Sequence, residues 1–290
     1  MQTTEDDARE KEKEFQTEKL VWTRIYYGRE VMERILETID VKRALHQRFF
    51  LRYALRAAMA GIIICLMYIF AFGIKTDLGH DFNPALSKYL MSLNFSMALA
   101  FIYFTNSELL TSNFMYFTVG LYYGKVSWGD TMKIWGLCLI GNILGVVLIA
   151  ILVWSCRMLS DAVVENLVHT VDEKTVRTGA WQIFVEAVFA NYFINVSVIV
   201  VMQLREHLAK IVVLMMGVSI FAYMGFEHVV ANSALFAMAL LEKPESVNVL
   251  QVGKNFFFSL IGNYVGGGLV IGLFYAYLND HRRDASRPKA

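Results

Sequence analysis

Long stretches without a charged side chain constrain this chain more than any other feature of its sequence. Four blocks contain no Asp, Glu, Lys or Arg: residues 57–74, 134–156, 187–204 and 255–279. An α-helix crosses the roughly 30 Å of bilayer hydrocarbon with about 20 residues, and it satisfies its own backbone hydrogen bonds there. Only 18% of the 290 residues are charged, while 56% are hydrophobic. The sequence therefore predicts an all-α integral membrane protein.

Two further apolar blocks are too long for one straight span. Residues 89–124 contain a single charged residue, Glu108, and residues 211–241 contain only Glu227 and His228 near their middle. Charged groups at mid-membrane are costly, and the free backbone groups of an interrupted helix offset part of that cost. We therefore expect six spans, with the second and fifth interrupted. The predicted spans cover residues 50–74, 89–124, 132–156, 179–204, 211–241 and 253–279.

The region before the first span is polar and amphipathic. Its apolar residues Val31, Ile35 and Ile39 recur every four positions, a spacing that predicts a helix with one apolar face. We expect this helix to lie at the membrane or against a neighbouring subunit. The predicted parts are a cytoplasmic N-terminal amphipathic region (1–48), a transmembrane channel domain (49–280) and a basic cytoplasmic tail (281–290).

Charge and motif content narrow the class of protein. Lys and Arg are more numerous on the side that holds both ends of the chain, which predicts cytoplasmic termini in a multi-pass protein of the cell (inner or plasma) membrane. The net charge of +1 gives no basis for a nucleic-acid partner. There is no HExxH zinc motif and no GxSxG nucleophile elbow, so we expect neither an enzyme nor a metal or cofactor site.

Two motifs occur twice, once in each half of the chain. One places Asn five residues after Glu, and the other is Gly-Asn-x-x-Gly. In chain order they occupy residues 108–113, 141–145, 227–232 and 262–266. Because each half then holds three spans, the halves must have inverted topology. Inverted repeats with interrupted helices place a solute site near the bilayer midplane.

His228 is the only histidine inside a predicted span. An intramembrane ionisable side chain is a candidate functional residue, and imidazole titrates near physiological pH. His228 could therefore protonate a weak-acid anion or attract it with a positive charge. The alternative is a structural histidine with satisfied hydrogen bonds.

Each of the other polar residues near the interruptions could have one of two roles. Glu108 and Glu227 occupy equivalent places in the two halves, so we expect them to hold the broken helix ends rather than to act on a solute. Thr111, Asn113 and Asn232 could supply neutral hydrogen bonds to a solute or cap the half-helices.

The segment Gly225-Phe-Glu-His228-x-x-x-Asn232 resembles the signature of the formate/nitrite transporter family. These are pentameric channels with an aquaporin-like inverted-repeat fold, and the resemblance covers about residues 50–279. It implies pore constrictions at one group of apolar residues and polar pore contacts at another. The implied constrictions are Phe95, Leu99, Leu109 and Phe221; the implied polar residues are Thr111 beside the histidine, the pore asparagine Asn191 and the vestibule lysine Lys174.

The resemblance is incomplete at several positions. Asn106 stands where a glycine is usual, Leu110 replaces a customary phenylalanine, and Asn195 and Ser197 make the fourth span more polar. The family relation implies a homopentameric channel in the lipid bilayer for protons and small monovalent anions: formate, nitrite, lactate, acetate or hydrosulfide.

We expect the anion to be neutralised by or near His228 before it crosses the apolar constrictions, because apolar walls cannot replace its hydration. Three alternatives stay open. The histidine could be charged and conduct bare anions, the pore could carry water or polyols, or the protein could be a membrane scaffold without transport.

Overall fold

The computed structural model describes residues 12–13, 16–17, 28–79, 82–280 and 282. The predicted basic tail lies outside the described residues except for Arg282, as does most of the polar leader before residue 28. The described chain is helical and contains no strand. Six of its helical stretches are long and apolar enough to cross a membrane: α3 (Phe50–Leu78), α4 (Pro84–Phe104), α6 (Trp128–Ser155), α8 (Ala180–Gln203), α9 (His207–Met224) and Val249–Leu278. The fold class is thus as predicted.

The second and fifth spans are interrupted, as the sequence predicted. α4 ends at Phe104 and the chain becomes helical again in α5 (Leu110–Tyr122). Likewise α9 ends at Met224, and α10 (Val229–Glu242) follows. The last span is continuous but changes its helical winding, passing through α11 (Val249–Asn263), the π-helix η3 (Tyr264–Leu273) and α12 (Phe274–Leu278). A short 3-10 turn, η2 (Pro244–Ser246), joins α10 to α11.

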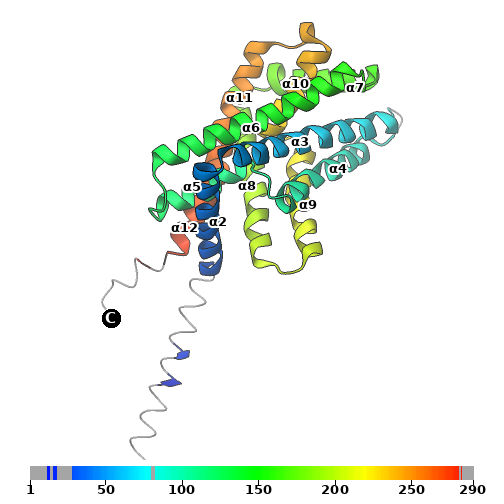
Figure 1. Cartoon of the computed structure of the whole chain (residues 1–290). Coiled ribbons are helices and arrows are strands. Elements are labelled where there is room, and N and C mark those ends of the chain that lie inside the picture. Colours follow the sequence, from blue (N-terminus) through cyan, green and yellow to red (C-terminus); the bar gives the residue numbers. More distant parts are fainter. Residues whose placement is uncertain (1–11, 14–15, 18–27, 80–81, 281, 283–290) are drawn as a thin grey trace, which may run out of the picture.

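Glycines let the long helices approach closely. A Cβ atom on Gly145 of α6 would lie 1.9 Å from the backbone oxygen of Ala58 on α3. In the other half, a Cβ atom on Gly266 of η3 would lie 2.1 Å from the backbone oxygen of Val188 on α8. Only a residue without a side chain allows these contacts, so the repeated Gly-Asn motif sets equivalent helix pairs at short range. Figure 1 shows α3 and α6 running side by side.

A helix that the sequence did not predict follows α6. This helix, α7 (Asp161–Asp172), buries Val163, Val164, Leu167 and Val171 and continues into the π-helical turn η1 (Glu173–Arg177). Its apolar side packs on α3 and α10. The segment therefore covers parts of α3 and α10, and Figure 1 shows α7 beside α10.

The N-terminal helix α2 (Arg29–Arg48) packs on its own chain. Val31, Met32, Ile35 and Ile39 are buried, and the helix contacts α3 and α5. The apolar spacing thus predicted the helix and its buried face correctly. The apolar face packs on α3 and α5 of the same chain (Figure 1), and the placement of the helix at the membrane or against another subunit stays a prediction.

Candidate functional site

Each interruption begins with a residue in the left-handed backbone region. Asn106 has φ of 52° and Gly225 has φ of 79°, and each lies two residues before the glutamate of its loop. Glycine adopts this conformation without strain, and asparagine tolerates it better than most residues. The unusual Asn106 therefore meets the same backbone requirement as the glycine of the other loop.

In each half, one asparagine of the following span forms hydrogen bonds with the backbone of the interrupted region. The side-chain oxygen of Asn142 accepts the backbone N–H of Leu110 at 3.1 Å, and its amide nitrogen donates to the backbone oxygen of Glu108 at 2.8 Å. Asn263 does the same in the second half, with Val229 N–H at 2.8 Å and the backbone oxygen of Glu227 at 3.0 Å. These bonds satisfy backbone groups that each break leaves free inside the bundle.

The two glutamates are buried and each meets a lysine. Lys42 of α2 donates to Glu108 at 2.5 Å, and Asn113 donates to the same carboxylate oxygen at 3.0 Å. In the other loop Lys174 of η1 donates to Glu227 at 3.1 Å. Both carboxylates thus accept side-chain donors, and their role in holding the broken helix ends stays a prediction.

The remaining contacts of Glu227 come from two asparagine side chains. Asn255 donates to the second carboxylate oxygen at 3.0 Å, and Asn232 donates to it as well. In both loops the glutamate thus meets one lysine and the asparagine five residues later, as expected of two repeats, and Asn255 is an additional partner of Glu227. Asn232 therefore contacts Glu227, and His228 is the N-cap of α10; a contact between Asn232 and a solute stays a prediction.

His228 forms the N-cap of α10. Its Nδ1 accepts the backbone N–H of Ala231 at 3.1 Å, and its Nε2 lies 2.8 Å from the hydroxyl of Thr111. Because Nδ1 accepts, the neutral ring carries its proton on Nε2 and donates it to Thr111. The ring is 2% exposed and stacks on Phe221 with centroids 5.8 Å apart. The structure therefore brings together the histidine and the threonine that the sequence proposed.

Asn191 of α8 contacts the first turn of α5 and the end of α11. Its amide nitrogen donates to the backbone oxygens of Thr111 at 3.1 Å and of Asn263 at 2.6 Å. Asn195, one turn later, also donates to the Thr111 oxygen, at 3.3 Å. Asn191 thus fixes the backbone of Thr111 through its nitrogen, while its side-chain oxygen is buried without a partner among the described residues. Direct contact between Asn191 and a solute stays a prediction.

The predicted constriction residues surround a small space next to His228, which we call the chamber. The chamber measures about 20 Å³, and its walls include Phe95, Leu99, Leu109, Phe221 and His228. Apart from the imidazole, the side chains that line it are apolar. Phe95 and Phe221 meet edge to face, with centroids 6.2 Å apart. The four residues are therefore close enough to form a single narrow passage.

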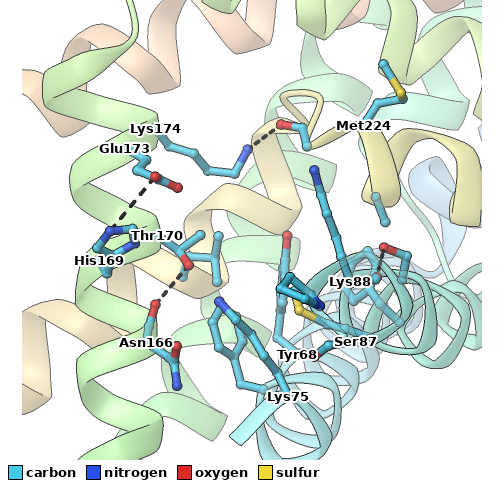
Figure 2. Close-up of a pocket in the computed structure, with 18 of the residues that line it drawn as sticks. Tyr68, Lys75, Ser87, Lys88, Asn166, His169, Thr170, Glu173, Lys174 and Met224 are labelled. Carbon is cyan, nitrogen blue, oxygen red and sulfur yellow. Dashed lines mark hydrogen bonds and ion pairs between the residues drawn. The ribbon is translucent and has the colours of Figure 1, made fainter. Parts of the chain in front are cut away.

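A much larger cavity lies on the other side of the two phenylalanines, and we call it the vestibule. It has a volume of about 850 Å³ and shares Phe95 and Phe221 with the chamber. Tyr68 also lines it and packs on Phe95 with centroids 4.3 Å apart. Figure 2 shows lysines from three elements around this cavity, one of them Lys174 with its ammonium directed to a backbone oxygen.

Some members of the site were not predicted. Lys42 was not predicted as a site residue, although it contacts Glu108 across 66 positions of sequence. No local sequence pattern indicates this contact, because it depends on how α2 packs on α5. Tyr68 carries no motif and is recognised only from its contact with Phe95. Among the described residues, no group of three or more His, Cys, Asp or Glu side chains could hold a metal ion.

Comparison with known proteins identifies the family. The chain matches the family described as "Formate/nitrite transporter" over residues 29–277. The chain belongs to the formate/nitrite transporter family. It is 28% identical over 236 residues to the nitrite transporter NirC of Escherichia coli (strain K12), covering 81% of this chain and 85% of that one.

Two solved structures of formate/nitrite transporter proteins are similar in fold. One, described as an "FNT family ion channel", has a TM-score of 0.76 at 24% identity and is matched over 98% of its length by 86% of this chain. The other, a "Pentameric formate channel with formate bound", has a TM-score of 0.67 at 25% identity, with coverage of 96% of that chain and 78% of this one. The resemblance noted in the sequence is therefore confirmed at the level of family and fold.

Proposed function

We propose that this protein is a membrane channel for small monovalent weak-acid anions of the formate, nitrite, lactate, acetate and hydrosulfide class, with transport rather than catalysis as its activity. The proposal is supported by the family membership and by relatives named for formate and nitrite. One observation carries it: the polar pair of His228 and Thr111 lies beside a chamber whose other walls are apolar. Such a passage favours a small solute that carries no charge while it crosses the narrowest point of the passage.

Desolvation explains why neutralisation matters. An anion that entered the chamber would lose its water, and Leu99, Leu109, Phe95 and Phe221 offer no donor to replace it. The protonated acid carries no net charge and loses far less. We therefore propose that the anion takes up a proton from the vestibule solution at the entrance of the chamber, crosses as the neutral acid, and releases that proton into the solution on the far side.

His228 takes part in this step through Nε2. In its neutral form the ring donates from Nε2, and we propose that the crossing acid replaces Thr111 as the partner of that group. Proton transfer from His228 requires a transient imidazolium, in which both ring nitrogens carry hydrogen. The backbone N–H of Ala231 would then lose its acceptor, at a cost of about 1–3 kcal/mol. The cap therefore favours the neutral ring between transfer events.

We further propose a homopentamer in the cell membrane with both termini cytoplasmic, which places the vestibule outside. The pentameric state is supported by the similar solved channel that is described as pentameric. The orientation is supported by the distribution of Lys and Arg. Lys42 would then approach its glutamate from the cytoplasmic side and Lys174 from the outside.

Flux measurements on purified protein in proteoliposomes test the proposed function. Vesicles should swell in ammonium formate, acetate or lactate, and labelled formate should enter in proportion to channel content. Swelling in glycerol without formate entry would instead establish the neutral-solute pore. Absence of both fluxes would favour a scaffold without transport.

A further inference from the structure

Two lysines of the vestibule have no part in the contacts described so far. Lys75 belongs to α3 and Lys88 to α4, and both line the vestibule together with Lys174 (Figure 2). Lys174 is occupied, because it donates to Glu227 and to the backbone oxygen of Gly225. Neither Lys75 nor Lys88 forms an ion pair with any described residue. The vestibule therefore holds two ammonium groups that remain available to an anion.

The helical register places both lysines at the same height above the aromatic constriction. Lys75 follows Tyr68 by seven residues on α3, and Lys88 precedes Phe95 by seven residues on α4. Tyr68 and Phe95 are in ring contact, at 4.3 Å between centroids. Seven residues are two turns, or about 10.5 Å, and return a side chain to the same face of its helix. Both lysines thus stand on the passage-facing side of their helices, two turns outward of the rings.

Aromatic rings, and no described carboxylate at ion-pair distance, surround the two lysines. The Lys75 ammonium lies 5.9 Å from the ring centroid of Phe72, and the Lys88 ammonium lies 5.2 Å from that of Tyr223. These neutral rings orient the side chains without removing the charge. Glu173 attracts the Lys75 ammonium from beyond ion-pair distance, and Lys88 repels it less strongly. An anion between the lysines would relieve this repulsion.

Four glutamates also line the vestibule, and none of them belongs to α3 or α4: Glu165, Glu173, Glu186 and Glu227. Glu173 lies 3.9 Å from His169, and Glu186 accepts a hydrogen bond from Gln182 at 2.7 Å. Glu227 is bound to Lys174 at 3.1 Å. The part of the cavity between α3 and α4 is therefore the part whose charge favours an anion.

We propose that Lys75 and Lys88 together form an anion-binding site that captures a small carboxylate or inorganic oxyanion in the vestibule, two helical turns before the aromatic constriction. This site deepens the proposed function and rests on it for its physiological role. It concentrates the anion where the proton is taken up, whereas Lys174 serves chiefly to hold Glu227. A dicarboxylate should bind there too, because it can meet both ammonium groups at once.

The transport test compares variants in proteoliposomes at low ionic strength. In the double variant Lys75→Gln/Lys88→Gln, the KM for formate influx should rise about tenfold while the maximal rate changes less than twofold, because focused charge raises local anion concentration. The control Lys243→Gln removes one positive charge from a residue that does not line the vestibule and should leave KM unchanged. Lys75→Arg/Lys88→Arg keeps both charges and should restore the wild-type KM.

An unchanged KM in the Gln double variant would overturn the site, as would an equal rise in the Lys243→Gln control. A loss confined to the maximal rate would overturn it too, since that loss indicates damage to the passage.

A binding test separates this inference from the proposed function. Saturation-transfer NMR with succinate as the probe should show binding to the wild-type protein and a dissociation constant at least about tenfold weaker for the Gln double variant. If formate flux is absent from wild type but succinate binding depends on the two lysines, the site stands and the proposed function fails. If formate flux is present but the Gln double variant binds succinate as tightly as wild type, the anion-binding site is disproved and the proposed function is not affected.

Discussion

The backbone N–H of Ala231 donates to Nδ1 of His228 over 3.1 Å, so the first turn of α10 fixes which ring nitrogen faces Thr111. The same imidazole is therefore a helix cap and the polar group of the chamber. These two duties can be separated, because asparagine also caps helices but does not titrate.

We predict that His228→Asn keeps the fold and loses transport. Its side-chain oxygen can accept from Ala231, so thermal stability should stay within about 1 kcal/mol of wild type, whereas His228→Phe should lose the cap. Formate flux in His228→Asn should fall at least about tenfold, and the entry of protons with formate should fall with it. Wild-type flux with an unchanged entry of protons in this variant would exclude proton transfer at the histidine.

The buried ion pair of Lys174 and Glu227 should matter for stability. Lys174→Met leaves the carboxylate with amide partners only, and we expect a loss of about 3 kcal/mol in the free energy of unfolding. The double variant Lys174→Met/Glu227→Gln should recover part of it. Arg177→Met is the matched control from the same turn, because its bridge to Asp172 is exposed and should contribute at most about 1 kcal/mol. Equal losses for the two single variants, measured by unfolding in detergent, would contradict this account.

Helix packing around the first interruption should depend on Gly145. A methyl group there would collide with the backbone of α3, so Gly145→Ala should greatly reduce the yield of folded protein. Gly136 lies in the same helix with open space around its Cβ position, and Gly136→Ala should fold normally. Size-exclusion chromatography of both variants decides the point. A folded Gly145→Ala at wild-type yield would show that α3 and α6 can separate without penalty.

Docking of α2 should weaken in mild acid. Burial lowers the pKa of His46 from its ordinary value of 6.5, while Asp130 opposes the shift and Lys133 adds to it. A detached α2 therefore binds a proton first as the pH falls through about 6.5, so the docked state loses stability below that pH and keeps it above. Ile35→Cys, in a Cys156→Ser background, should label faster at pH 5.5 than at pH 7.5, normalised to unfolded protein. His46→Gln should remove this difference, and its persistence would point to another group.

Much of the fold could be predicted from the sequence because membrane insertion imposes strong local rules. The lengths of the apolar blocks and the charges within two of them predicted both interruptions. The helix α7 was not predicted because its segment has mixed polarity, and a surface loop can have the same composition as an amphipathic helix. The contact of Lys42 with Glu108 depends on how α2 folds back over α5, which no local pattern encodes.

The sequence also predicted which of several candidate site residues lie close together. The pairing of His228 with Thr111 and the grouping of the four apolar residues agree with the sequence-based expectation. The engagement of Lys174 by Glu227 and the fastening of Thr111 by Asn191 could not be inferred, because they depend on side-chain directions between separate helices.

The proposal that the weak acid crosses the chamber uncharged is tested most directly by the effect of membrane potential. Formate influx into proteoliposomes should be measured at 0 and −100 mV, set with valinomycin and potassium gradients, at equal pH on both sides. A bare anion that crosses the whole field gains or loses about 2.3 kcal/mol per 100 mV, so its flux would change strongly with the potential. We predict the same influx at both potentials and the entry of one proton with each formate. Influx that follows the potential without proton uptake would show that the anion crosses with its charge.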